Sequence, residues 1–356
     1  MAAKLRVGIL GAGEAGTGHA IAFSHLPNIE VVGLWSRTQK RAKKLAAQLG
    51  LSDVRLYDNW QTLVEDTTID IISLATPESL RRGPFLMALN EGHHILVEDA
   101  ISDNLPDAAA MVQAAKQAKT ITAACFNWRY APGTQAIWRE IRKGRIGQVR
   151  DVRTEYRYRR LTNRYYTAKG WKADAQVSGE SGVAGIEFDK IRFLTGCDIK
   201  RVVSRLAPYS PPKAKPFTLL DGASLHLLEM SNGSLATVRV TATAGEYEWS
   251  IVVCGEYGTL RGDLESVIRQ TVAGREVTPV KIPKGDGPSK DLELPEYVWY
   301  RLFQDFVGAI RRGDVAHATV PHLPSVEDGL KVLQAIMAAR RSAQEMRWVE
   351  LNELSG

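Results

Sequence analysis

The sequence predicts an α/β protein of two domains: an N-terminal domain built on a parallel sheet, and a C-terminal α+β domain with a large, mostly antiparallel sheet. The 356 residues exceed what a single hydrophobic core usually organises. The first part of the chain alternates short β-branched runs with helix-like segments, whereas after Cys125 long runs alternate apolar and polar residues without helices between them. We therefore expect domains at 1–124 and 125–356.

The expected strands of the first domain are short apolar runs at 6–10, 31–35, 69–75, 94–97 and 121–125. Amphipathic stretches such as 41–49 and 106–118 lie between these runs and have helical spacing. Parallel strands need crossover segments of this kind, so the alternation predicts a parallel sheet covered by helices.

The second domain shows the period-two pattern of strands with one buried face. The expected strands are 151–158, 224–229, 234–242 and 249–254. Turn signals at 231–233 and 255–258 bound these runs, and helical patterns return at 297–311 and 326–345. Strands with one buried and one differently covered face predict a mostly antiparallel sheet.

A glycine-rich turn follows the first strand and opens a helix. The glycines permit a tight turn and a close approach of the backbone, and the helix N-terminus stabilises a pyrophosphate. This context predicts a Rossmann domain that binds a nicotinamide dinucleotide. The expected contacts are Gly11, Ala12, Gly13, Glu14, Ala15 and Gly16.

The end of the second strand favours NADP over NAD. Enzymes that bind NAD usually place a carboxylate there, which accepts from the ribose hydroxyls. This chain has Ser36 at that position, followed by Arg37 and Arg41. A guanidinium group matches phosphate geometry, so we expect these residues to bind the 2′-phosphate of NADP, with NAD as the alternative.

The composition argues against a nucleic-acid-binding, a membrane-spanning or a secreted protein. The net charge of +6 is modest and acidic residues are interspersed, so the total charge does not indicate nucleic acid as a partner. No run of eighteen or more apolar residues predicts a membrane span, and residues 1–4 lead into a strand pattern without a signal-peptide apolar region. We expect a cytoplasmic protein. The three cysteines have apolar neighbours and fit buried thiols better than disulfides or a metal site.

Arginines and tyrosines are concentrated between 150 and 172, and two interpretations remain open. The strand part presents its charges on one face, which is typical of a subunit-contact or solvent face. Residues beyond the strand end are alternatively suited to bind a carboxylate, sulfonate or phosphate of the substrate. These candidates are Arg159, Arg160, Arg164 and Lys172.

Together with the glycine turn, several further motifs resemble the Gfo/Idh/MocA family, the glucose–fructose oxidoreductase and inositol dehydrogenase group. They lie at 70–77, 88–98, 126–132, 144–147, 193–196, 255–260 and 325–330. The resemblance implies a Rossmann domain, a second domain with an open sheet, an active site between them, and dimers or tetramers formed through the open sheet face.

The resemblance also implies which residues border the nicotinamide and the substrate. For the cofactor they are Thr76, Pro77, Glu98, Asn127 and Trp171; for the substrate they are Trp128, Arg129 and Glu187. A packing role for either tryptophan is an equal alternative.

The chain departs from the family at both catalytic signatures. The family's Glu-Lys-Pro motif reads Glu98-Asp99-Ala100, so the lysine and the proline are missing. A cis bond before a non-proline residue costs about 2.5–4 kcal/mol, and we therefore expect a trans bond here. The family's catalytic aspartate and histidine fall on Gly182 and Ile186. A register shift recovers an acid from Glu180, Glu187 or Asp189, but no histidine occurs between His94 and His226.

Asp99 is the leading candidate for proton transfer, with Asp189 and Glu180 as further catalytic candidates. A carboxyl group at Asp99 is able to act as a base toward an alcohol, or as an acid toward a carbonyl or imine if its environment raises its pKa. The alternative is a solvated loop residue. We expect an NADP(H)-dependent oxidoreductase acting on a sugar, a polyol or a related cyclic alcohol or carbonyl, including anionic ones. The alternatives are a non-reductive enzyme that retains the nucleotide, and an inactive nucleotide-binding sensor or regulator.

Overall fold

The structure is a computed structural model that describes residues 3–158, 180–209, 220–271, 277–283, 287–288, 291–314 and 322–354. The chain forms two compact units. The first comprises Met1–Tyr130 with Pro288–Leu330, and the second comprises Ala131–Gly287 with Lys331–Gly356. The sequence analysis placed a single boundary between 124 and 125. In the structure a late segment of the chain also belongs to the first unit.

The described part of the first unit contains a six-stranded sheet with the order β3-β2-β1-β4-β5-β6. All its paired strands are parallel, which confirms the predicted Rossmann sheet. The strands are β1 Leu5–Leu10, β2 Ile29–Trp35, β3 Arg55–Tyr57, β4 Ile71–Leu74, β5 His94–Val97 and β6 Thr122–Ala124. The strand order reverses between β1 and β4, and ligands of such sheets bind at the carboxyl ends of the strands near this point.

Helices cover this sheet because its strands are apolar on both faces. Val7, Ile9, Ile71, Ile72 and Leu74 are all fully buried, as expected for parallel strands between two helical layers. The helical segments are α1 Glu14–Ser24, α2 Gln39–Gln48, α3 Trp60–Val64, η1 Glu78–Leu80, α4 Arg82–Asn90, α5 Leu105–Gln117, η2 Asn127–Tyr130 and α8 Leu294–Arg312.

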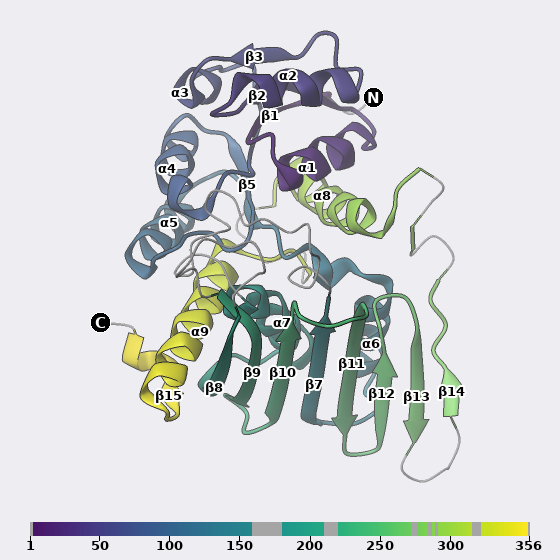
Figure 1. Ribbon diagram of the computed structural model, residues 1–356. Coiled ribbons are helices and arrows are strands. Elements are labelled where there is room, and N and C mark those ends of the chain that lie inside the picture. Colours follow the sequence, from purple (N-terminus) through teal and green to yellow (C-terminus); the bar gives the residue numbers. More distant parts are fainter. Residues whose placement is uncertain are drawn as a thin grey trace. The chain divides into compact units, whose positions relative to one another are not determined.

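The late helix α8 lies beside α1 in this unit (Figure 1). The two helices approach closely at Gly18, where a Cβ atom would lie 2.1 Å from the ring of Trp299. Only glycine leaves room for the indole at this position. The close packing directs Trp299 toward the loop that follows β5.

The described part of the second unit contains a nine-stranded sheet with the order β14-β13-β12-β11-β7-β10-β9-β8-β15. Its paired strands are antiparallel except for β7 and β10, so the mostly antiparallel sheet is confirmed. The strands are β7 Val149–Arg157, β8 Ile199–Tyr209, β9 Leu220–Met230, β10 Leu235–Thr241, β11 Glu248–Gly255, β12 Gly258–Gly262, β13 Val267–Thr271, β14 Val277–Pro279 and β15 Val349–Glu350.

One face of this sheet carries helices. Figure 1 shows α6 (Pro132–Arg142) and α7 (Glu180–Thr195) behind the strands, and α7 packs against β7, β9 and β10. Val152 and Thr154 point into this interface and are buried, whereas Arg153 between them is exposed on the other face. The helix α9 (Val326–Glu345) and the short η4 (Leu351–Leu354) complete the described elements. Among the described helices, none combines the length and the apolar character needed to cross a membrane.

Candidate active site

The glycine turn after β1 has the close packing that a dinucleotide-binding loop needs. Gly11 has a φ of +117°, and a Cβ atom there would lie 2.4 Å from the carbonyl oxygen of Ala75. At Gly16 a Cβ atom would lie 2.0 Å from the carbonyl oxygen of Gly11. Side chains at these positions would collide with the backbone, so both glycines are structural requirements of the turn.

Gly13 has a different role because a Cβ atom there would meet nothing within 4 Å. Gly13 is the N-cap of α1 and provides no side-chain cap. The first amide groups of a helix have no partner within the helix, and this positive end attracts anions. The open end of α1 therefore fits a pyrophosphate, with Glu14 and Ala15 in the first turn.

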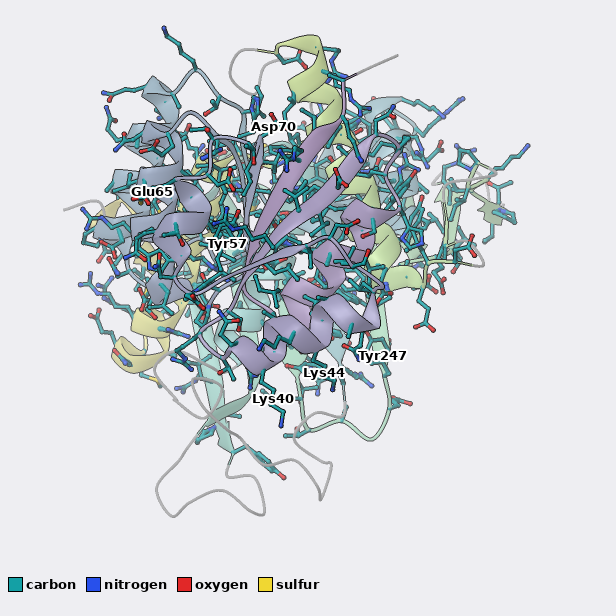
Figure 2. All side chains as sticks on the ribbon, turned by 90° about the horizontal axis from the view of Figure 1, so that it is seen from above. Lys40, Lys44, Tyr57, Glu65, Asp70 and Tyr247 are labelled. Carbon is teal, nitrogen blue, oxygen red and sulfur yellow. The ribbon has the colours of Figure 1, made fainter. Side chains whose placement is uncertain are left out.

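The segment after β2 places cations near the expected ribose position. Ser36 is buried, whereas Arg37 and Arg41 are exposed. The first turn of α2 contains no acidic residue. Figure 2 shows Lys40 and Lys44 on the outer side of α2, directed away from the sheet. The described residues at the start of α2 thus present positive charge without a carboxylate in that first turn.

The loop after β4 contributes Thr76 and Pro77. Thr76 is buried, and within the described part of the chain its Oγ1 atom has no hydrogen-bond partner. A buried polar atom normally has a partner, so this hydroxyl fits a contact with a bound nucleotide. The carbonyl oxygen of Thr76 accepts a hydrogen bond of 2.8 Å from Nε of the buried Arg81.

Arg81 also holds the loop after β5, which carries Glu98, Asp99 and Ala100. Its Nη1 atom donates to the carbonyl oxygen of Glu98 at 2.7 Å and to that of Ala100. The Asp99–Ala100 peptide bond is cis, so the expectation of a trans bond was wrong. The expectation considered only the intrinsic preference of the bond, whereas in the fold one guanidinium group binds the carbonyls on both sides of Asp99.

The Glu98 carboxylate lies in a network of buried donors. It accepts from Nε2 of His19 at 2.7 Å and from Nε1 of Trp299 at 3.0 Å. Nδ1 of the same histidine lies 2.7 Å from Oγ of Ser73. The sequence analysis assigned no role to His19 or Trp299. The sequence pointed to His19 only through its place on the helix that follows the glycine turn. It gave no signal for Trp299.

Opposing effects set the charge of this network. Burial alone would raise the pKa of Glu98, but the hydrogen bond and charge of His19 and the charge of Arg81 lower it below its usual value. Burial raises the pKa of the Cys125 thiol well above its usual range, and the charges of Glu98 and Asp99 act in the same direction. Glu98 is therefore the ionised group and Cys125 a neutral thiol.

His19, Glu98 and Cys125 are close enough together to be considered as metal ligands, since their donor atoms lie within 4.8 Å of one another. However, His19 Nε2 and Glu98 Oε1 are only 2.7 Å apart. Nitrogen and oxygen ligands of a tetrahedral zinc ion would be separated by about 3.3 Å, given metal–ligand distances of about 2.0–2.2 Å. The contact is a hydrogen bond.

Asn127, Trp128 and Arg129 form η2, directly after β6. Asn127 is buried and Trp128 is partly exposed. Arg129 is buried and forms an ion pair of 3.4 Å with Asp328 near the start of α9. The arginine thus holds η2 against a later segment of the same unit. Its expected contact with the substrate stays a prediction, as do the nucleotide contact of Asn127 and the substrate contact of Trp128.

In the second unit, α7 carries the acids that a register shift was expected to recover. Glu187 and Asp189 are buried, and Glu180 is the first residue of the helix. Glu187 accepts from Lys190 Nζ at 2.9 and 3.1 Å and from Trp249 Nε1 at 2.7 Å. The Lys190 ammonium lies 4.3 Å from the centre of the Trp249 ring, and burial lowers its pKa. The Glu187 carboxylate is therefore hydrogen-bonded to partners inside its own unit. The sequence analysis did not identify Lys190.

The basic segment is described only in part. Arg159, Arg160, Arg164, Trp171 and Lys172 lie outside the described residues. On β7, Arg157 forms ion pairs with Glu155 at 2.5 Å and Glu246 at 3.1 Å. Arg153 lies 3.3 Å from Asp151. These pairs agree with the interpretation of the strand part as a solvent or contact face.

Comparison with known proteins identifies the family. Residues 5–125 match the family model of the NAD-binding Rossmann domain of the GFO_IDH_MocA oxidoreductases, and residues 134–261 match the GFO/IDH/MocA C-terminal domain. The chain belongs to the GFO/IDH/MocA family. It is accordingly an oxidoreductase of the NAD-binding, sugar- or polyol-dehydrogenase type.

Similar proteins of the GFO/IDH/MocA family include two dehydrogenases and a reductase. Levoglucosan dehydrogenase of Pseudarthrobacter phenanthrenivorans is 22% identical, and the match covers 99% of both chains. Myo-inositol 2-dehydrogenase of Thermotoga maritima is 22% identical over 99% of this chain and 100% of that protein. 1,5-anhydro-D-fructose reductase of Ensifer adhaerens is 25% identical over 96% and 98%.

A similar solved structure is levoglucosan dehydrogenase in complex with NADH and levoglucosan. It superposes with a TM-score of 0.87 at 21% identity, over 98% of this chain and 99% of that one. This likeness shows that the two chains share their fold.

Proposed function

We propose that this protein is an NADP(H)-dependent oxidoreductase that interconverts an alcohol and a carbonyl on a sugar, a polyol or a related cyclic compound, with Asp99 as the proton-transfer group. One observation carries the proposal. The glycine turn, Thr76 and the Glu98–Asp99 pair follow β1, β4 and β5, which are neighbours in the sheet. Their loops therefore meet at the edge where such sheets bind dinucleotides.

The residues of the first unit have separable roles in this proposal. The open N-terminus of α1 binds the pyrophosphate, and Gly11 and Gly16 allow the turn to approach it. The bound nicotinamide supplies or accepts the hydride. Asp99 gives a proton to the carbonyl oxygen in reduction, or takes it from the hydroxyl group in oxidation. Arg81 fixes the backbone on both sides of Asp99.

The preference for NADP rests on Ser36, Arg37 and Arg41. Ser36 places no carboxylate near a 2′-phosphate, and the two exposed arginines supply planar donors for it. We expect Arg37→Ala to weaken NADP binding by about tenfold, the loss of one charge-assisted hydrogen bond, while NAD binding changes little. Fluorescence titration with both nucleotides measures this. Lys44→Ala is the matched control because Lys44 points away from the sheet (Figure 2). Equal losses for both nucleotides in Arg37→Ala would contradict the preference.

The activity itself is tested with a panel of compounds taken from the relatives: levoglucosan, myo-inositol and 1,5-anhydro-D-fructose, plus one sugar phosphate to test an anionic substrate. The absorbance of the reduced nicotinamide reports turnover in both directions. A protein that binds neither NADP nor NAD overturns the proposal. Nucleotide binding without turnover of a wider panel supports the alternative of a sensor, for which the apolar Gly182 and Ile186 also argue.

We also propose that the outer face of the second unit's sheet joins copies of the chain into a dimer or tetramer. Leu225 and Leu235 on this face are 54% and 45% exposed. Large apolar side chains in such positions favour burial against a partner.

A further inference from the structure

Arg81 is a buried cation that uses only part of its hydrogen-bonding capacity. Its side chain is 4% exposed, and a guanidinium group carries five N–H donors. Nε donates to the carbonyl oxygen of Thr76, and Nη1 donates to the carbonyl oxygens of Glu98 and Ala100. These bonds use three donors. Both N–H groups of Nη2 are left without a partner among the described residues.

The charge of Arg81 is also not paired directly. A buried charge is normally paired with an opposite charge. Within the described ranges of the chain, no carboxylate forms an ion pair with Arg81. Its charge acts on Glu98 from a greater distance, but that carboxylate is hydrogen-bonded to His19 and Trp299. Main-chain carbonyl groups thus hold the Arg81 cation in place without neutralising it.

The bonds that Arg81 already makes determine which ligand its free group suits. A guanidinium binds a carboxylate or a phosphate best through two parallel N–H bonds. Such a pair of bonds needs Nη2 together with either Nη1 or Nε, and both of these atoms bind the main chain. Nη2 therefore suits a single oxygen atom better than a two-oxygen anion.

The position of Arg81 indicates which oxygen this is. The pyrophosphate is expected at the turn after β1, whereas Glu98 and Ala100 follow β5, two strands further along the sheet. Two strand spacings amount to about 10 Å. Asp99 lies between the two carbonyl groups that Nη1 binds. The unused donor is therefore held beside the loop that carries the proton-transfer group, on the far side of β4 from the phosphate turn.

We propose that Nη2 of Arg81 donates a hydrogen bond to the reacting oxygen of the substrate and stabilises the negative charge that develops on it. The inference rests on the proposed function and adds a second catalytic residue to it. In reduction, the carbonyl carbon receives the hydride, the electron pair of the C=O double bond moves to the oxygen, and Asp99 supplies the proton that completes the hydroxyl group. In oxidation, the same hydrogen bond stabilises the oxygen as Asp99 removes its proton. Arg81 keeps its own protons throughout.

The first experiment observes the hydrogen bond itself and needs no turnover. The full-length protein is saturated with oxidised NADP, which has no hydride to give, and mixed with the ¹³C-labelled ketone that corresponds to myo-inositol. Infrared difference spectroscopy then records the carbonyl stretching band. A hydrogen bond from a cation weakens the C=O bond, so we expect the bound ketone to absorb at lower wavenumber than the free ketone in water. The shift should be smaller in Arg81→Gln.

Arg82→Gln is the matched control, because Arg82 is the neighbouring arginine but is exposed and pairs with Asp107 at 3.4 Å. Its shift should equal that of the wild type. A wild-type band at or above its position in water overturns the proposal, and so does a shift that Arg81→Gln retains in full. The wild-type measurement decides even if the Arg81 variants do not fold.

The second experiment measures the reaction. We expect kcat for reduction to fall by about a hundredfold in Arg81→Gln, the usual loss for one donor to a developing oxyanion. Arg81→Lys keeps the charge and should lose only about tenfold. KM for the ketone and the nucleotide Kd should change less than about twofold, because the hydrogen bond strengthens only as charge develops on the oxygen. Arg82→Lys should keep the wild-type kcat.

These outcomes separate the inference from the proposed function. If the protein binds none of the compounds, the proposed function fails and the role of Arg81 fails with it. If Arg81→Gln reduces a ketone with the wild-type kcat, the oxidoreductase activity stands and the role of Arg81 is rejected. Equal losses in kcat and in nucleotide affinity would also reject it, since Arg81 would then only shape the loops that bind the nucleotide.

Discussion

Gly13 and Gly16 differ in what they leave room for, although they belong to the same turn. The space at Gly16 is closed by the backbone of Gly11, whereas Gly13 faces open space. Gly16 serves the fold of the turn, and Gly13 serves the approach of a ligand. Replacing each glycine by alanine, which adds one methyl group, therefore tests the two roles separately.

We expect Gly16→Ala to lower the free energy of unfolding by at least about 1–3 kcal/mol, the usual cost of overpacking, and to abolish nucleotide binding. Gly13→Ala should fold with nearly unchanged stability but bind NADP more weakly, because its methyl group lies where the pyrophosphate approaches. Thermal unfolding without nucleotide and fluorescence titration with NADP measure the two effects. A Gly16→Ala variant as stable as the wild type would show that the turn adapts.

Some residues of the candidate site were predictable from the sequence, and others were not. The glycine turn and Asp99 were identifiable because a short local motif determines their place. His19, Trp299 and Arg81 were not, because each acts through a partner distant in sequence. Trp299 reaches Glu98 across 201 positions. No local pattern encodes such a contact, and the cis bond at Asp99–Ala100 likewise depends on tertiary packing.

At the level of elements, Trp249 on β11 joins α7 to the sheet of the second unit, because its Nε1–H donates to Glu187 and its ring faces the Lys190 ammonium. Glu187 and Lys190 form a buried ion pair within α7. Both charged side chains are fully buried. Removing one partner leaves a buried charge without compensation, while removing both charges is much less costly. This asymmetry makes the pair testable.

We expect Lys190→Met to destabilise the protein by about 3–5 kcal/mol, and the double variant Glu187→Gln/Lys190→Met to recover much of that loss. The glutamine keeps an acceptor for Trp249. Urea denaturation followed by tryptophan fluorescence gives both values. If the double variant is less stable than Lys190→Met, the ammonium contributes mainly through packing rather than charge compensation.

His226 on β9 gives the second unit a pH dependence of stability. Burial lowers its pKa from 6.5 to about 3, and its Nδ1 atom contacts Oγ of Ser204 at 2.7 Å. Between these two pKa values the unfolded chain binds a proton that the folded chain does not. The free energy of unfolding therefore falls as the pH drops from about 6.5 toward 3.

We expect His226→Gln to flatten this slope, since glutamine is able to keep a hydrogen bond to Ser204 and does not titrate. Urea unfolding at several pH values between 4 and 7 measures it. The exposed His25 provides the control, because His25→Gln should leave the slope unchanged. Identical slopes in wild type and His226→Gln would assign the acid sensitivity to other groups.

The elements themselves were predictable to different degrees. The strands β1, β2, β4, β5 and β6 and the alternating strands β7, β9, β10 and β11 have clear apolar patterns, and each was found. The edge strands β3, β14 and β15 and the inner strands β12 and β13 were missed because each has five residues or fewer, so their pattern is weak. The long strand β8 was also missed, since its second half, from Arg205, alternates little between buried and exposed residues.

On the scale of the whole molecule, we expect the sheet face opposite α6 and α7 to determine how copies of the chain associate in solution. Leu225 lies at a hollow of about 310 Å³ that Val203, Leu227, Thr237 and Met346 also line. Arg157 on β7 of the same sheet forms ion pairs with Glu155 and Glu246. An apolar centre beside paired charges is typical of a surface that contacts a partner.

We therefore expect light scattering to give the mass of a dimer or tetramer, and Leu225→Lys to shift it toward the monomer. Leu80→Lys changes a leucine of similar exposure in the first unit and serves as the control. A wild-type protein that remains monomeric at high concentration would reject the proposed assembly.

The return of α8 to the first unit has a consequence for how the protein is made. A ribosome completes all six strands of the Rossmann sheet by residue 124, but Trp299 emerges only after most of the second unit has been synthesised. Until then Glu98 has no indole donor and Gly18 faces an empty groove. An isolated fragment ending at Tyr130 would thus be an unfinished domain, and a circularly permuted chain that begins at Pro288 and joins Gly356 to Met1 would contain α8 before the Rossmann strands are synthesised.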